Sequence, residues 1–201
     1  MDFDVLILGG GAAGMSCALL LGSAKEKSYA QNKKVGIILH QKSSHLQTAV
    51  FYNVLGLNPG TPGSEILKEG QVHLQKTYPQ VQQITREKVK EIQFLEQGFK
   101  VLTNKNSYTT GQVVVAVGYS DLIRIKGLEN YIISHKKAPA AKNRIQLINE
   151  DHLVVPGLFV AGSLAGHRSQ YAIACGSGAA VATDILTEWN NGVPSMVHDK
   201  F

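Results

Sequence analysis

Cysteine is scarce in this sequence, whose 201 residues contain two, Cys17 and Cys175. No Cys-x-x-Cys pair occurs, so the sequence supports neither a zinc site nor a local dithiol redox pair. Long apolar runs are also lacking, since nothing approaches the roughly 18 consecutive apolar residues of a membrane-spanning helix. The N-terminus, MDFDVLILGG, starts with acidic residues and is apolar over only a few positions, unlike a secretory signal. We expect a cytoplasmic protein with no metal site and no membrane partner.

The charge shows no strong local pattern, although the formal net charge is +5. The cations are scattered, with examples at Lys25, Lys27, Lys33, Lys34, Lys136, Lys137, Lys142 and Arg144. A basic balance can attract an anionic ligand or nucleic acid. No basic run is interleaved with aromatic residues, so we expect no nucleic-acid partner. The preferred interpretation of these cations is a solvated surface.

Glycine, by contrast, is abundant at 20 residues and is clustered. The run GGGAAG at 9–14 fits G-x-G-x-x-G, in which the glycines permit a tight turn, the approach of a pyrophosphate and close helix–strand packing. An apolar run at 4–8 precedes it, helix formers follow at 12–25, and 33–40 resembles a second buried strand. This context is a parallel βαβ unit, which predicts an α/β, Rossmann-like FAD/NAD(P)-binding fold.

The rest of the chain predicts further elements of such a fold. Residues 41–63 are rich in turn formers, 64–78 is an amphipathic helix with Ser64 as its N-cap, and QVQQI at 80–84 is a short strand. Residues 86–110 alternate polar and apolar, with breaks at EQG and NKN, which predicts a small antiparallel meander. A buried strand at 112–120, one or two short strands within 121–150, a strand at 157–162 and a helix from about Tyr171 to Trp189 complete the prediction.

The end of the second strand carries His40 and Gln41. A nicotinamide-binding fold would be expected to carry an acid there for the ribose hydroxyls. Either side chain can hydrogen-bond a hydroxyl, but neither supplies a carboxylate. The alternative is that His40 only ends a strand.

Four segments resemble the FAD domain of the thioredoxin reductase family, within the pyridine nucleotide-disulfide oxidoreductases. They are DVLILGGGAAGMSCA, FYNVLGL, VVVAVGYSDLIRIKGLENY and VPGLFVAGSLAGHRSQYAIACGSGAAVATDI. The resemblance implies that the N-terminal loop holds the pyrophosphate of FAD. The late segment would then return beside the first strand to hold the ribityl chain and the flavin ring, so that two distant halves form one site.

The resemblance assigns the cofactor-binding residues one by one. They are Gly9, Gly11, Ala12, Ala13, Gly14, His40, Gln41, Asn53, Val89, Ala116, Gly118, Gly162, Ser163, Gln170 and Tyr171. Val89 stands where a backbone group meets adenine, and Ser163 replaces an acid of the family pattern. Two loop histidines expected near the flavin, His45 and His167, are the candidates for proton transfer. The alternative is that both face solvent.

The sequence departs from the family in the interval 129–152, which has no room for the NADPH-binding domain expected there. We therefore expect a single FAD-binding domain over 1–201, with a first half 1–120, a connecting segment 121–152 and a second half 153–201. Without Cys-x-x-Cys, thioredoxin reductase activity is not expected, and Cys17 and Cys175 are interpreted as small apolar groups.

Two functions follow from these patterns. The first is an FAD-dependent oxidoreductase that exchanges electrons with an external donor or acceptor. The alternative is a non-catalytic flavin- or nucleotide-binding sensor, carrier or subunit. The resemblance also implies a homodimer.

Overall fold

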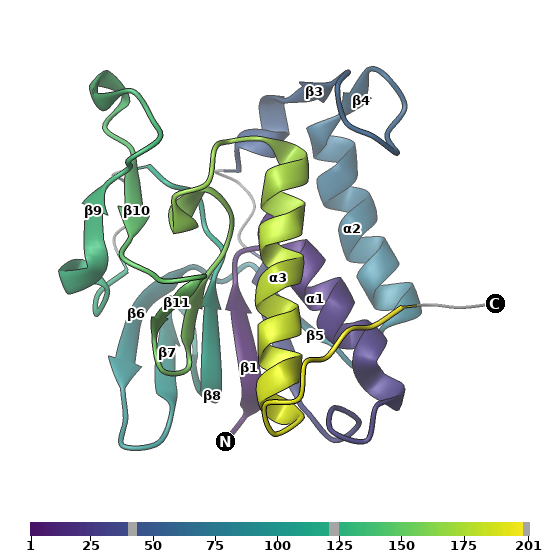
Figure 1. Ribbon diagram of the computed structural model, residues 1–201, viewed down its shortest axis with the longest axis vertical. Coiled ribbons are helices and arrows are strands. Elements are labelled where there is room, and N and C mark those ends of the chain that lie inside the picture. The colour runs from purple at the N-terminus through teal and green to yellow at the C-terminus, as the bar shows by residue number, and fades with distance from the viewer. Residues whose placement is uncertain (40–43, 121–124, 199–201) are drawn as a thin grey trace.

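A mostly parallel sheet lies at the centre of the protein (Figure 1). The computed structural model describes residues 1–39, 44–120 and 125–198, and eight strands of this part form the central sheet. The parallel strands stand in the order β12 (Leu158–Val160), β8 (Ser107–Val115), β1 (Phe3–Leu8), β2 (Val35–Leu39) and β5 (Gln82–Thr85). β11 (Leu153–Val155) pairs antiparallel with β12 at the edge. Strands from both ends of the chain thus share one sheet, and the predicted α/β Rossmann-like class is confirmed.

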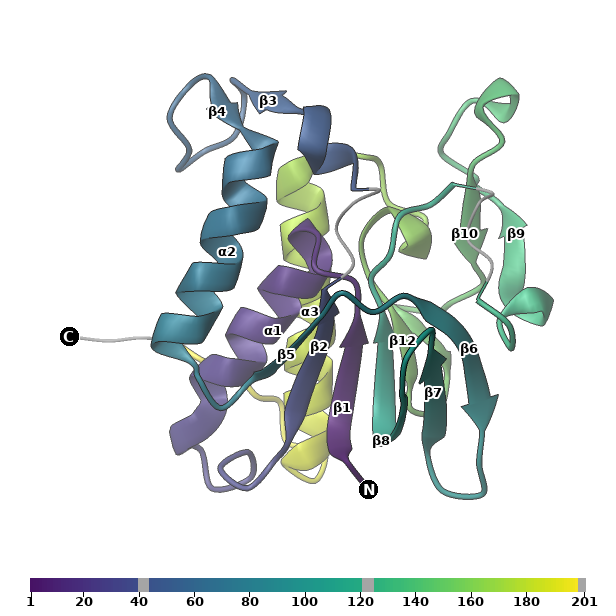
Figure 2. The same cartoon turned by 180° about the vertical axis from the view of Figure 1, so that it is seen from behind.

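Helices cover one face of this sheet (Figures 1 and 2). They are α1 (Ala12–Ser23), α2 (Gly63–Thr77) and α3 (Tyr171–Trp189). Successive side chains of a strand point to opposite faces of the sheet, so the core is divided into two clusters. Val5 and Ile7 of β1 pack with α1 and α3, while Leu6 and Leu8 pack on the opposite face. α3 has the bounds that its sequence pattern predicts. No helix of the described residues combines the length and the apolar character that a membrane crossing requires.

The predicted antiparallel meander is present, with one difference. β6 (Val89–Phe94), β7 (Phe99–Thr103) and the first half of β8 form it. The sequence predicts a new strand at 112, but β8 continues through Gly111, and Thr110 pairs with both Phe99 of β7 and Phe3 of β1. A Cβ on Gly111 would lie 3.0 Å from the Asp4 carbonyl oxygen. The glycine therefore allows a close approach between strands and does not end the strand.

The predicted loop at 41–63 contains short elements in its described part. They are a 3-10 helix at His45–Thr48, β3 (Val50–Phe51) and β4 (Thr61–Pro62), which pairs antiparallel with β3. The prediction of Ser64 as N-cap is wrong, since α2 begins at Gly63 after Pro62, whose backbone is extended. The helix thus begins two residues before the start that an N-cap at Ser64 would give, and a Cβ on Gly63 would overlap the Leu46 carbonyl, so a glycine is needed in this first turn.

The described part of the connecting segment, 125–152, contains a separate two-stranded hairpin. β9 (Ile132–Ser134) pairs antiparallel with β10 (Ile145–Leu147), and short 3-10 helices lie at Glu129–Tyr131 and Ala140–Lys142. Residues 125–152, all of them described, contain no α-helix and no second βαβ unit. In Figures 1 and 2 the hairpin stands on the opposite side of the molecule from α2.

Candidate cofactor-binding site

The turn between β1 and α1 depends on its glycines. Gly9 has φ +114°, which other residues rarely adopt, and a Cβ there would lie 2.5 Å from the Ala116 carbonyl oxygen. A Cβ on Gly14 would overlap the Gly9 carbonyl oxygen. The two glycines therefore let α1 start directly against the ends of β1 and β8.

Two helices begin here without a side-chain cap. α1 starts after Gly11 and α3 after Gln170, neither residue caps its helix through its side chain, and neither first turn contains an acid. The first N–H groups of a helix have no intrahelical acceptor and carry part of the positive end of the helix dipole. Two helix starts able to bind an anion are thus available to one ligand.

Close packing brings these two helix starts together. A Cβ on Gly178 of α3 would overlap the Ala13 carbonyl of α1, and a Cβ on Gly162 would lie 3.1 Å from the Ala13 Cβ. Only residues without a side chain allow this approach. Figure 2 shows the N-terminal ends of α1 and α3 at the same edge of the sheet, beyond the end of β1.

A groove of about 230 Å³ lies between these helix starts. Its lining residues are Gly11, Ala12, Ala13, Ser44, His45, Leu46, Ala49, Phe51, Ala116, Val117, Gly118, Ala161, Gly162, Ser163, Arg168, Ser169, Gln170, Tyr171 and Ala174. Gly11 and Gln170, from opposite ends of the chain, therefore face the same space. A Cβ on Gly118 would meet nothing within 4 Å, so part of the wall is open. Arg168 is the charged side chain of this lining, which suits an anionic ligand.

Apart from His167, the predicted site residues divide into four groups. Ten line the groove: Gly11, Ala12, Ala13, His45, Ala116, Gly118, Gly162, Ser163, Gln170 and Tyr171. Gly9 and Gly14 build the turn behind it. Asn53 is exposed and Val89 is buried in the core on the meander side, and neither is part of the lining. His40 and Gln41 lie outside the described residues, and the assigned cofactor roles of all these residues stay predictions.

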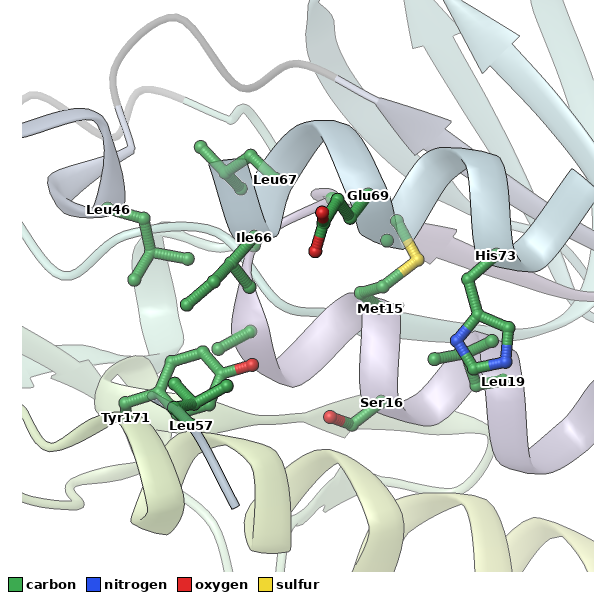
Figure 3. A pocket seen from close by; sticks show the side chains of 14 residues that line it. Met15, Ser16, Leu19, Leu46, Leu57, Ile66, Leu67, Glu69, His73 and Tyr171 are labelled. Carbon is green, nitrogen blue, oxygen red and sulfur yellow. The ribbon is translucent and has the colours of Figure 1, made fainter. Parts of the chain in front are cut away.

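A second cavity of about 310 Å³ adjoins the groove and shares Gly11, Ala12, Leu46 and Tyr171 with it. Figure 3 shows Met15, Leu19 and Ile66 among its lining side chains, with the Tyr171 hydroxyl directed into it. Tyr171 also contacts Phe51, with ring centroids 5.1 Å apart. Burial, together with neighbouring Cys175, raises the pKa of Tyr171. The phenol therefore stays protonated at neutral pH, as a hydrogen-bond donor between the two spaces.

A histidine cluster supports the groove from behind. The His152 Nε2 lies 3.0 Å from the His167 Nε2 and 3.0 Å from the Ser177 Oγ, which accepts a 2.8 Å hydrogen bond from the Gly162 N–H. His135 Nε2 lies 3.1 Å from the Ser163 carbonyl oxygen and 3.2 Å from that of His167. The His167 ring is thus paired with His152 and is not part of the groove lining. Sequence reasoning missed His135 and His152, because no local pattern links three histidines so far apart.

We expect acid to destabilise this cluster. Burial is the main cause that lowers the pKa of His152 and His167, and the charge of His152 lowers the pKa of His167 further. The unfolded chain therefore binds protons more readily, and stability is complete above the ordinary histidine pKa of about 6.5 and falls as the pH drops through that value. Only one proton fits between the two facing Nε2 atoms. Melting temperatures measured across this range should show less acid sensitivity in His167→Gln, and an unchanged pH dependence would contradict the assignment.

Comparison with known proteins supports the same fold. The protein resembles an oxidoreductase from Agrobacterium tumefaciens, at 16% identity and a TM-score of 0.70 over 94% of this chain and 98% of that one. It also resembles a thioredoxin reductase from Gloeobacter violaceus, at 17% identity and a TM-score of 0.70 over 98% of this chain and 99% of that one. A ferredoxin-flavin thioredoxin reductase from Clostridium acetobutylicum is similar at 16% identity and a TM-score of 0.68, over 94% of this chain and 98% of that one. No curated protein matches.

The family assignment comes from the sequence match. The profile of the pyridine nucleotide-disulphide oxidoreductases matches residues 3–178, which is most of the 201-residue chain and includes both helix starts of the groove. The resemblance inferred from the four sequence segments is therefore confirmed. This chain belongs to the pyridine nucleotide-disulphide oxidoreductase family.

Proposed function

We propose that residues 1–201 form a single FAD-binding domain that works as a flavin-dependent oxidoreductase and receives its electrons from an external donor. The observation that carries this proposal is the meeting of two uncapped helix starts, at Gly11 and Gln170, in one groove. An extended ligand with a pyrophosphate near its middle fits such an arrangement, because one helix start can bind the phosphates and the other can face the ring.

Each part of the groove has a role in this proposal. The N–H groups after Gly11 would hold the pyrophosphate, and the backbone at Ala116 and Gly118 would face the cofactor from the end of β8. The α3 N-terminus would stabilise negative charge on the ring, since the helix dipole is positive there. When bound, FAD supplies the electron-accepting chemistry. Ser163 offers a hydroxyl where the family pattern has an acid, and a lost charge-assisted hydrogen bond weakens retention by about 1.5–3 kcal/mol.

An external electron source follows from the connecting segment, where residues 125–152 contain only the β9–β10 hairpin and short 3-10 helices. Disulfide exchange within the chain has no support, because Cys17 and Cys175 are both free thiols and burial raises the pKa of Cys17. Free thiols also favour the cytoplasm as the proposed compartment. The name of the Clostridium protein indicates a ferredoxin donor for that enzyme, which supports a protein donor here.

A homodimer is part of the proposal. Large apolar side chains are exposed at Val50, Tyr52, Leu55, Val72 and Ile173, on β3, the β3–β4 connection, α2 and the start of α3. Joined in one contiguous patch, such side chains would form an interaction surface. We expect Leu55→Glu to shift the protein from dimer to monomer in analytical ultracentrifugation. Leu95→Glu, the same change at an exposed leucine of the meander, is the control, and a dimer that survives Leu55→Glu would contradict this surface.

The test of the function begins with the purified protein and FAD. We expect FAD to bind with the visible absorption of an oxidised flavin, and an anaerobic external donor to bleach that absorption. NADH, NADPH and a chemically reduced ferredoxin are the donors to compare. Bound FAD that none of them reduces would favour the alternative, a non-catalytic flavin-binding carrier, sensor or subunit. A protein that does not take up FAD would contradict the oxidoreductase and the flavin-binding form of the alternative.

A further inference from the structure

The β9–β10 hairpin carries much of the positive charge of the chain. The segment Ile132–Ile148 reads IISHKKAPAAKNRIQLI and contains Lys136, Lys137, Lys142 and Arg144 but no carboxylate, so it contributes +4 against a net charge of +5 for the whole chain. The three lysines are exposed. The nearest acids in the sequence flank the segment, at Glu129, Glu150 and Asp151. The charged side chains of this segment are thus all positive.

Backbone pairing and aromatic contacts hold this charge in place. Ser134 pairs with Ile145 at the end of the ladder next to the connection 135–144, and Lys136 N–H donates a 2.9 Å hydrogen bond to Gln146 Oε1. The Arg144 guanidinium carbon lies 5.0 Å from the Tyr119 ring centroid. Its Nε is buried and has no hydrogen-bond partner among the residues that the structure describes. The three lysines are therefore exposed on an ordered hairpin, and the Arg144 side chain packs against Tyr119.

The hairpin is joined to the wall of the groove. His135 contacts the carbonyl oxygens of Ser163 and His167, and a Cβ on Gly166 would press on the Gln146 side chain. The positive charge of Lys137 is near enough to lower the pKa of His167, after burial and His152. Arg168, exposed in the same loop, lines the groove and has the same sign of charge. The positive surface of the hairpin thus continues to the edge of the groove.

The shape of this surface suits a protein better than a small anion. None of Lys136, Lys137, Lys142 and Arg144 lines either the groove or the adjoining cavity. Small-molecule sites are concave and enclose their ligand, whereas exposed charges spread over a hairpin match a complementary charged surface. The segment also lacks aromatic residues between its lysines, which stacking with nucleic acid would use.

We propose that the β9–β10 hairpin is the docking surface for an acidic, one-electron iron–sulfur carrier protein, which it holds beside the flavin groove. This inference rests on the proposed function, because it names the external donor class of that site. Two reduced carriers would each lose one electron, and FAD would take up both electrons together with two protons. Weak redox complexes bury less than about 1,200 Å², and charged patches guide their encounter.

The experiment measures docking directly with a purified acidic [2Fe–2S] ferredoxin as the probe. Binding to the FAD-free and the FAD-loaded protein is followed by isothermal titration calorimetry at low and high salt. We expect binding at low salt in both forms, with weakening at high salt because counterions screen exposed charges. The triple variant Lys136→Glu, Lys137→Glu, Lys142→Glu should bind at least about tenfold more weakly, since it reverses the charge that attracts the partner.

The control changes the net charge equally at exposed lysines elsewhere. It is Lys25→Glu, Lys27→Glu, Lys34→Glu, and we expect its affinity to stay within about twofold of the parent because surface charges far from the contact are screened. Equal binding by the parent and the hairpin variant, or no ferredoxin binding at low salt, would overturn the docking surface. Preferred binding of single-stranded DNA through the same lysines would overturn it too. Because the FAD-free protein is also measured, a failure of docking stays distinct from a failure to bind FAD.

Discussion

Gly11→Asp is expected to abolish FAD binding while the protein keeps its fold. Gly11 has φ −80° and ψ −168°, an extended conformation open to any residue, and a Cβ there would meet only the Ser44 Oγ at 3.9 Å. Aspartate is also a favoured N-cap. Its carboxylate would stand where the pyrophosphate is expected, and like charges brought together cost several kcal/mol. We expect an affinity loss of at least about 100-fold, or 2.7 kcal/mol.

The matched control for this change is Gly11→Asn. Asparagine caps a helix as well as aspartate and has nearly the same volume, but it carries no charge. FAD affinity measured by fluorescence titration should fall far less in this variant, and both variants should melt at or above the parent temperature. Equal FAD affinity in the aspartate and asparagine variants would contradict a phosphate at this helix start.

Gly178→Ala is expected to cause a large loss of stability. The added methyl group would overlap the Ala13 carbonyl of α1, and a backbone atom cannot move aside without shifting the whole helix. Overpacking in a core costs typically 1–3 kcal/mol, and we expect about 3 kcal/mol at this position. FAD affinity should fall as well, because the two helix starts would separate. Urea unfolding and FAD titration measure the two effects.

Gly176→Ala is the control in the same helix. A Cβ at Gly176 would meet nothing within 4 Å, and the residue is exposed. Alanine in a helix interior is favoured over glycine by roughly 0.5–1 kcal/mol, so this variant should be more stable than the parent. If both alanine variants were equally stable, close packing of α3 on α1 would not be what positions the groove.

Local sequence patterns predicted much of this arrangement. The apolar run before GGGAAG and the helix formers after it predicted β1 and α1, and α3 has the predicted bounds Tyr171–Trp189. The two helix starts follow from these elements. The pairing of distant segments could not be predicted from local patterns. In the sequence Gly111 separates two predicted elements, and only the closeness of the Asp4 carbonyl in the structure explains the glycine.

Other features depend on contacts that no local pattern contains. His135, His152 and His167 meet only because three segments far apart in the sequence return to the same edge of the molecule. The four cations of the β9–β10 hairpin lie close together in the sequence, at 136–144, but the sequence does not show what they lie beside. Only the contacts of His135 with the loop at 163–167 place those cations beside the groove.

The central claim is that the starts of α1 and α3 bind one FAD molecule together. Titration of the ¹⁵N-labelled, 21.7 kDa protein with FAD, followed by NMR, tests it most directly. We predict that the amide signals of Ala12 and Ala13 and those of Tyr171 and Ala172 shift together along a single saturation curve. Shifts confined to one of the two helix starts, or two different curves, would contradict the claim.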